Sequence, residues 1–174
     1  MTPRPIESLS YNRELKKYVI NQLLSNKEPH GLISYFKDEE DARDKLSDAF
    51  DDSYDYDGYS LAKILEIDHN IDSDSTLVDI LNSISYHVRV GSRKMELQWV
   101  IDNRVTPKLK LDDTVKFEYF QQIIDDGKIV KVDTEFAEYY VTSPTICTTR
   151  NGVTTKATII KFENLERWNP KHEE

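Results

Sequence analysis

The spacing of apolar residues changes along this 174-residue chain, and the change limits the folds that it can adopt. In the first half, apolar residues recur three and four positions apart, as in Leu77, Ile80, Leu81 and Ile84. This is the spacing of one face of an α-helix. In the second half, β-branched residues gather in short runs, which are typical of β-strands. The sequence therefore predicts an α+β fold in which helices precede strands.

Three or four helices are expected between residues 10 and 88. The first is predicted to begin after Ser10 or Asn12, because either side chain can accept hydrogen bonds from the free amides of a first turn. The second is predicted to cover Glu39–Phe50, with Asp38 as its cap and with its acidic residues opposite an apolar stripe.

Two shorter stretches with helical spacing follow. YSLAKILEI is expected to form a helix capped by Ser60, and DSDSTLVDILNSISYHV a helix capped by one of residues 74–76. Together with the first two, these helices would make the first half of the chain almost wholly α-helical.

A β-rich part is expected to begin at residue 89. Met95, Leu97 and Trp99 alternate with polar residues, which predicts a hairpin that turns at Gly91. The stretch KIVKVDT is predicted to be a further strand.

The stretch LDDTVKFEYFQQIIDDGK fits two structures. Val115 and Phe117 alternate as in a strand, whereas Phe117, Phe120 and Ile124 are spaced as on a helix. Capping acids before this run and Gly127 after it favour the helix.

A hairpin across residues 137–162 is the clearest local prediction. Two β-branched runs, EYYVTSPTICTT and VTTKATIIKF, flank Asn151–Gly152. Asn-Gly is the preferred pair where both central residues of a turn need positive φ. Pro144 cannot donate a hydrogen bond to a neighbouring strand, so an edge position or a bulge is expected there.

We expect one α+β domain over residues 10–170, in which a helical lobe at about 10–88 packs with a β-rich lobe at about 89–168. Residues 1–9 are expected to form a flexible tail, and residues 171–174 a charged tail. The chain has no apolar run of the roughly 20 residues that a membrane span needs, so a cytoplasmic location is expected.

The formal net charge of −9 is concentrated in one window. Residues 37–79 contain fifteen acidic and four basic residues, a net charge of −11, whereas the other 131 residues together carry +2. Such a field repels phosphate backbones and attracts basic surfaces. The acidic half is therefore not expected to bind nucleic acid directly.

Several classes of catalytic and cofactor site are excluded. The five glycines lie at least 25 residues apart, so neither a dinucleotide fingerprint nor a phosphate-binding P-loop can form. The chain also lacks a Gly-x-Ser-x-Gly elbow, a cysteine pair for zinc and a His-Glu-x-x-His motif, and no cofactor is expected. Cys147 lies in a strand-like stretch without a helix N-terminus to lower its pKa, which favours an inert side chain over a nucleophile.

The stretch DHNIDSDSTLVD resembles an EF-hand calcium loop in one frame. Ser73 stands where such a loop requires glycine for its sharp turn. The other interpretation, which we favour, is a connection whose acids cap the next helix, with no bound metal. The candidate metal ligands are Asp68, Asn70, Asp72, Asp74 and Asp79.

The stretch FDDSYDYDGYS, residues 50–60, contains four aspartates and three tyrosines and no basic residue. Carboxylates here and in the preceding helix can stand in for phosphates, and tyrosine rings can stack on arginine. The alternative is a solvated loop whose tyrosines cover the neighbouring core. The candidate partner-binding residues are Glu39, Glu40, Asp44, Asp48, Asp51, Asp52, Tyr54, Asp55, Tyr56, Asp57 and Tyr59.

In size, acidity and lack of catalytic motifs, the chain resembles small accessory proteins that phages and mobile elements encode against host defences, such as anti-CRISPR and anti-restriction proteins. The resemblance lies in composition and in no motif. We expect a non-enzymatic inhibitor that acts as a nucleic-acid mimic and occludes the basic surface of a nucleic-acid-binding partner. A phage-encoded protein of this kind would act in the cytoplasm of the host cell.

Two other functions remain open. A metal-dependent hydrolase would require acids of residues 51–57 to converge with Asp68, Asp72 or His69. A structural or assembly subunit would pair with a neighbour through the edge of the carboxy-terminal hairpin, and self-association into a homo-oligomer is compatible with the sequence.

Overall fold

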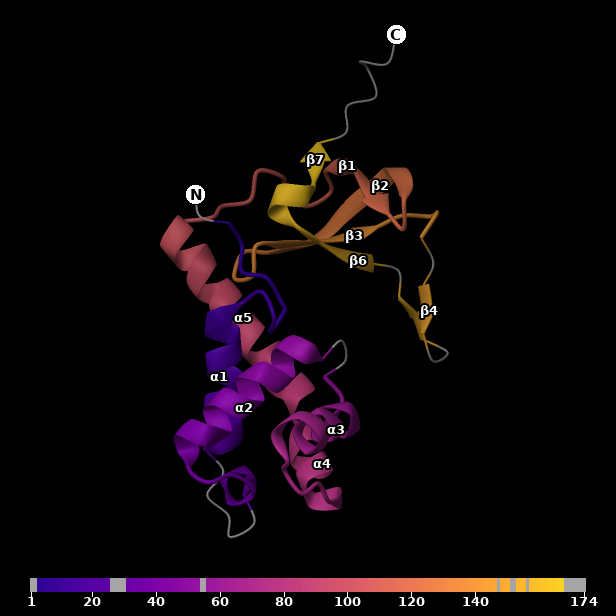
Figure 1. The fold of residues 1–174 in the computed structure, drawn as a ribbon. Coiled ribbons are helices and arrows are strands. Elements are labelled where there is room, and N and C mark those ends of the chain that lie inside the picture. Colours follow the sequence, from indigo (N-terminus) through magenta and orange to yellow (C-terminus); the bar gives the residue numbers. More distant parts are fainter. Residues whose placement is uncertain are drawn as a thin grey trace. The chain divides into compact units, whose positions relative to one another are not determined.

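The structure, a computed structural model, confirms the predicted α+β class. Helices form the first part of the chain, and an antiparallel sheet forms the second (Figure 1). The chain divides into two compact units, Met1–Trp99 and Val100–Glu174. Whether these units are lobes of a single domain stays a prediction. The residues that the structure describes are 3–25, 31–53, 56–146, 148–150, 153–155 and 157–167.

Helices build the first unit, and the predicted helices up to residue 82 are confirmed. Their apolar faces meet in one core, in which Leu15, Leu46 and Leu77 are almost completely buried. The boundary between the two units falls within the last helix. The helices in the described residues are α1 (Arg13–Leu24), the 3-10 helix η1 (Leu32–Tyr35), α2 (Glu39–Asp52), α3 (Gly58–His69), α4 (Ser75–Asn82) and α5 (Ile84–Asn103).

Polar side chains cap the helices largely as predicted. Asn12, Asp38 and Asp74 each accept a hydrogen bond from the amide three residues ahead, at 2.8–3.0 Å. The cap predicted for α3 is wrong, because Asp57 and not Ser60 caps this helix. The carboxylate can accept from two amides of the first turn at once, which leaves Ser60 inside the helix.

The hairpin predicted around Gly91 is also wrong, because the residues on both sides of it belong to α5. A Cβ atom at Gly91 would lie 2.6 Å from Cδ1 of Tyr18 and 2.7 Å from Cδ1 of Leu15. The glycine therefore marks the close approach of α5 to α1, which lie side by side in Figure 1. Ser92 and Glu96 are polar but buried, so they hid the helical period in the sequence.

Replacing Gly91 by alanine tests this packing. Alanine has the higher helix propensity, by about 1 kcal/mol, but its Cβ would overlap Tyr18 and Leu15, and overpacking costs about 1–3 kcal/mol. We expect Gly91→Ala to lower the free energy of unfolding, measured by urea denaturation, and Gly91→Val to lower it further. Stabilisation by Gly91→Ala would contradict the close approach.

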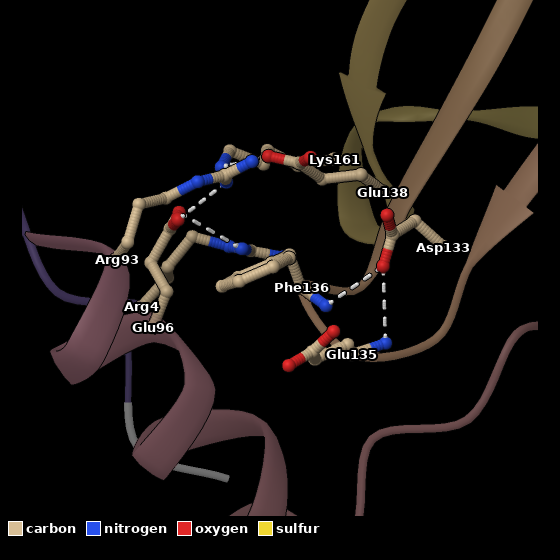
Figure 2. Close-up of polar contacts among 8 residues, drawn as sticks. All are labelled: Arg4, Arg93, Glu96, Asp133, Glu135, Phe136, Glu138 and Lys161. Carbon is tan, nitrogen blue, oxygen red and sulfur yellow. Dashed lines mark hydrogen bonds and ion pairs between the residues drawn. The ribbon is translucent and has the colours of Figure 1, made fainter. Parts of the chain in front are cut away.

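Glu96 is a buried acid, with 2% of its side chain exposed, and two arginines neutralise it. Figure 2 shows both guanidinium groups directed at it, with Arg4 3.2 Å from Oε1 and Arg93 2.9 Å from Oε2. The Arg4 guanidinium also lies 4.7 Å from the centre of the Trp99 ring. Residues 1–9 were expected to form a flexible tail. In their described part, Arg4 instead pairs with Glu96 of α5, and Leu9 is fully buried in the core.

Loss of the Glu96 charge should destabilise the protein strongly. Glu96→Gln would leave two arginines without their shared carboxylate, and breaking a buried ion pair costs about 3 kcal/mol or more. Glu14→Gln is the matched control, because its pair with Lys17 is exposed and should contribute at most about 1 kcal/mol. Urea denaturation measures both variants, and equal effects would refute a special role for the buried pair.

The second unit is built on a five-stranded antiparallel sheet of order β6-β3-β2-β1-β7, and β4 and β5 form a separate pair. The last strand, β7, returns to pair with β1, and so β6 and β7 form the two edges of this sheet. Tyr139 stacks on Phe162 with ring centres 4.2 Å apart. The strands are β1 (Thr114–Tyr119), β2 (Gln122–Asp133), β3 (Glu138–Thr142), β4 (Thr148–Arg150), β5 (Val153–Thr155), β6 (Ala157–Lys161) and β7 (Glu166–Arg167), with a 3-10 helix η2 (Phe162–Asn164) before β7.

The helix favoured for LDDTVKFEYFQQIIDDGK is wrong, because this stretch forms the β1–β2 hairpin. Tyr119 pairs with Gln122, and the two turn residues between them, Phe120 and Gln121, have φ of 46° and 65°. Such turns normally use asparagine or glycine, so this one carried no recognisable sequence signal.

KIVKVDT lies within β2 as predicted, apart from its last residue. At the end of this strand, the Asp133 side chain accepts hydrogen bonds from the amides of Glu135 and Phe136 (Figure 2).

The hairpin predicted across residues 137–162 is confirmed in its strands. β3 pairs with β6 and β4 pairs with β5, both antiparallel. Pro144 lies between β3 and β4, where the regular pairing is interrupted. Asn151–Gly152, like Cys147 and Trp168, lies outside the described residues.

Candidate protein-binding surface

Four of the predicted partner-binding acids form one row along α2. Glu40, Asp44, Asp48 and Asp52 recur every four residues and are all exposed. Asp44 and Asp48 flank the buried Leu46 by two positions, so each projects about 200° around the helix from the core. None of the four makes a side-chain hydrogen bond or ion pair with a residue that the structure describes. We call these four residues the acidic stripe.

Neighbouring cations neutralise other predicted members of this surface. Glu39 lies 2.6 Å from Arg43, one turn further along α2. Asp51 lies 2.7 Å from the Lys16 ammonium group, which α1 supplies. The carboxylates available to a partner are therefore fewer than the composition of residues 37–79 suggested.

The loop after α2 has mainly structural roles in its described part. The Tyr56 hydroxyl accepts a hydrogen bond from the Leu9 amide at 3.2 Å, and its ring meets Phe50 edge-on at 6.4 Å. This matches the interpretation in which a tyrosine of the loop covers the core. Tyr59 is 62% exposed and remains available for contact. Tyr54 and Asp55 lie outside the described residues.

Asp57 serves the start of α3. Its side chain accepts hydrogen bonds from the amides of Tyr59 and Ser60, each at 3.0 Å. The Ser60 hydroxyl and these amides hold the pKa of the Asp57 carboxyl below its ordinary value, because they bind the charged form. The charge is thus committed to capping a helix, although the group is exposed.

The stretch that resembles an EF-hand loop connects α3 to α4. Asp74 caps α4, with the Leu77 amide 2.8 Å away, and accepts a hydrogen bond from the Tyr35 hydroxyl at 2.7 Å. Asn70 has φ of 53° and ends α3. The capping interpretation is therefore confirmed for Asp74.

Candidate metal ligands do not gather in the part of the chain that the structure describes. No group of three or more His, Cys, Asp or Glu side chains there is placed to hold a metal ion. This applies to Asp68, Asp72 and His69, which the hydrolase hypothesis would bring together with the acids of residues 51–57.

A groove of about 590 Å³, which is open to solvent, lies between α1 and α2 and was not predicted from the sequence. Arg13, Lys16 and Lys17 line it from α1, and Arg43 and Asp51 line it from α2. Lysine and arginine recur at three- and four-residue spacing in α1, but only the structure places Arg43 opposite them. One wall of this basic groove is therefore formed by α2, a helix of the acidic window.

Comparisons of the chain with protein-family models, with curated proteins and with solved structures found no match. No helix in the described ranges is both long and apolar enough to cross a membrane.

Proposed function

We propose that the protein acts without catalysis, by binding the basic surface of a partner that normally grips DNA or RNA. The observation that supports this function is the acidic stripe, whose four exposed carboxylates have no cationic partner among the described residues. Binding there would occlude the nucleic-acid site of the partner and inhibit it.

The spacing of the stripe residues determines how closely their charge density approaches that of a nucleic-acid strand. Residues four apart on a helix rise about 6 Å along its axis, whereas one DNA strand carries a charge every 3.4 Å or so. The stripe therefore has roughly half of the linear charge density of one strand. It extends over about 18 Å, which matches a short segment of backbone.

Affinity must come from burial of the whole row. An exposed ion pair contributes about 0–1 kcal/mol, so one carboxylate alone would bind weakly. A shape-matched partner that removes water from all four at once would bind them more tightly, and the association rate would fall with salt. The exposed Tyr59 on α3 adds a flat ring that can stack on arginine.

Charge reversal on the stripe tests the proposal. A partner captured from the native host is first identified by mass spectrometry and purified, and its affinity is then measured by calorimetry at 50 and 300 mM salt. We expect Asp44→Lys with Asp48→Lys to lower the affinity at least tenfold, because two attractive pairs become repulsive. Circular dichroism should show an unchanged fold, since both residues are exposed.

The matched control is Glu118→Lys with Asp125→Lys, which changes the net charge equally on two exposed acids of the β1–β2 hairpin. It should leave the affinity within twofold of the unmodified protein. An equal loss in both double variants would show a general charge effect, and full affinity in the stripe variant would end the proposal.

A second candidate function, assembly through a strand edge, is supported by the position of β6. This strand pairs only with β3 among the described strands, and its Ile159 is 51% exposed. We expect such an assembly to be a homo-oligomer that light scattering detects at both low and high salt and that Ile159→Lys dissociates. A monomer at all concentrations tested would refute it.

A further inference from the structure

The groove between α1 and α2 combines cations that differ in how firmly they are held. Lys16 has 12% of its side chain exposed and is held by Asp51 at 2.7 Å, so its ammonium group is fixed at the wall. Arg13 is exposed and has no side-chain partner among the described residues. The Lys16 ammonium group is thus preorganised in the wall of the groove, and the Arg13 guanidinium group is available to a ligand.

The other two cations are paired weakly. Lys17 lies 3.0 Å from Glu14, and Arg43 lies 2.6 Å from Glu39 and also donates a hydrogen bond to Oδ1 of Asn21 at 2.5 Å, but both ion pairs are exposed to solvent. Exposed pairs of this kind contribute little and exchange readily. A ligand with two or more negative charges can therefore replace Glu14 and Glu39 as the partner of these cations.

An aromatic ring completes the site. Tyr11 lines the groove and is 83% exposed, which leaves its ring free for a flat ligand to stack on. Base stacking on exposed aromatic rings strengthens binding in proteins that bind single-stranded nucleic acid. The volume of about 590 Å³ lies within the range of small-ligand sites.

We propose that this groove binds a small ligand of the nucleoside phosphate class, with its phosphate between α1 and α2 and its base on Tyr11. The guanidinium groups of Arg13 and Arg43 are planar, and each can donate two parallel hydrogen bonds to two oxygens of a phosphate. The site does not depend on the acidic stripe, because none of the four stripe residues lines the groove.

Calorimetric titration of the full chain with AMP, adenosine and inorganic phosphate separates the two halves of the site. We expect AMP to bind saturably and at least tenfold more tightly than adenosine or inorganic phosphate alone. Tyr11→Ala should reduce the affinity for AMP to that for phosphate and leave phosphate binding unchanged. Absence of saturable AMP binding at millimolar concentrations would overturn the proposal.

Substitution of the cations tests where the phosphate binds. Arg13→Gln with Lys17→Gln should lower the affinity for AMP at least tenfold, while circular dichroism shows an intact fold, because both side chains are exposed. Lys108→Gln with Lys110→Gln removes the same charge from two exposed lysines that do not line the groove, and should keep the affinity within twofold. Equal losses would overturn the assignment, and so would displacement of AMP by an equal concentration of tetraglutamate.

Discussion

The close approach of α1 to α5 at Gly91 is the constraint on which the helical unit depends. Without a Cβ atom, α5 reaches the side chains of Leu15 and Tyr18 directly, and α1 is fixed along one side. The opposite side of α1 faces α2 across the basic groove. The same contact that completes the core therefore also determines where Arg13, Lys16 and Lys17 lie.

Two surfaces of opposite charge share α2. Arg43, Ser47 and Asp51 recur every four residues and line the groove. Asp44, Asp48 and Asp52 of the acidic stripe each follow one of these residues by one position, turned by about 100° around the helix. The regular rotation of the helix is enough to separate a cationic recess from an exposed acidic row, and neither surface needs an insertion or a long loop.

The sequence predicted structure well where the determining contacts are local. The caps at Asn12, Asp38 and Asp74 act on amides three residues away, so a short window contains both partners. Prediction failed around Gly91, because Glu96 is buried by virtue of Arg4, 92 residues away. Without that partner in view, a polar residue at position 96 looked like the outer face of a strand.

The same distinction explains the functional surface. The excess of acids was visible in the composition, and the row on α2 follows from helical spacing alone. Which carboxylates are neutralised was not visible, since the partner of Asp51 comes from a different helix. The β1–β2 turn was missed for another reason. Phe120 and Gln121 adopt positive φ although neither is asparagine or glycine, the residue types that normally signal such a turn.

The pairing of α1 with α5 sets the order of events during synthesis. The part of α1 that faces α5, at Leu15 and Tyr18, stays uncovered until residue 91 and its neighbours have been synthesised. Closure over such a separation is slow compared with local helix formation, and an uncovered face attracts other chains. The nascent chain therefore exposes this part of α1 while the 73 residues that follow Tyr18, up to Gly91, are synthesised, and chaperone binding is favoured during that interval.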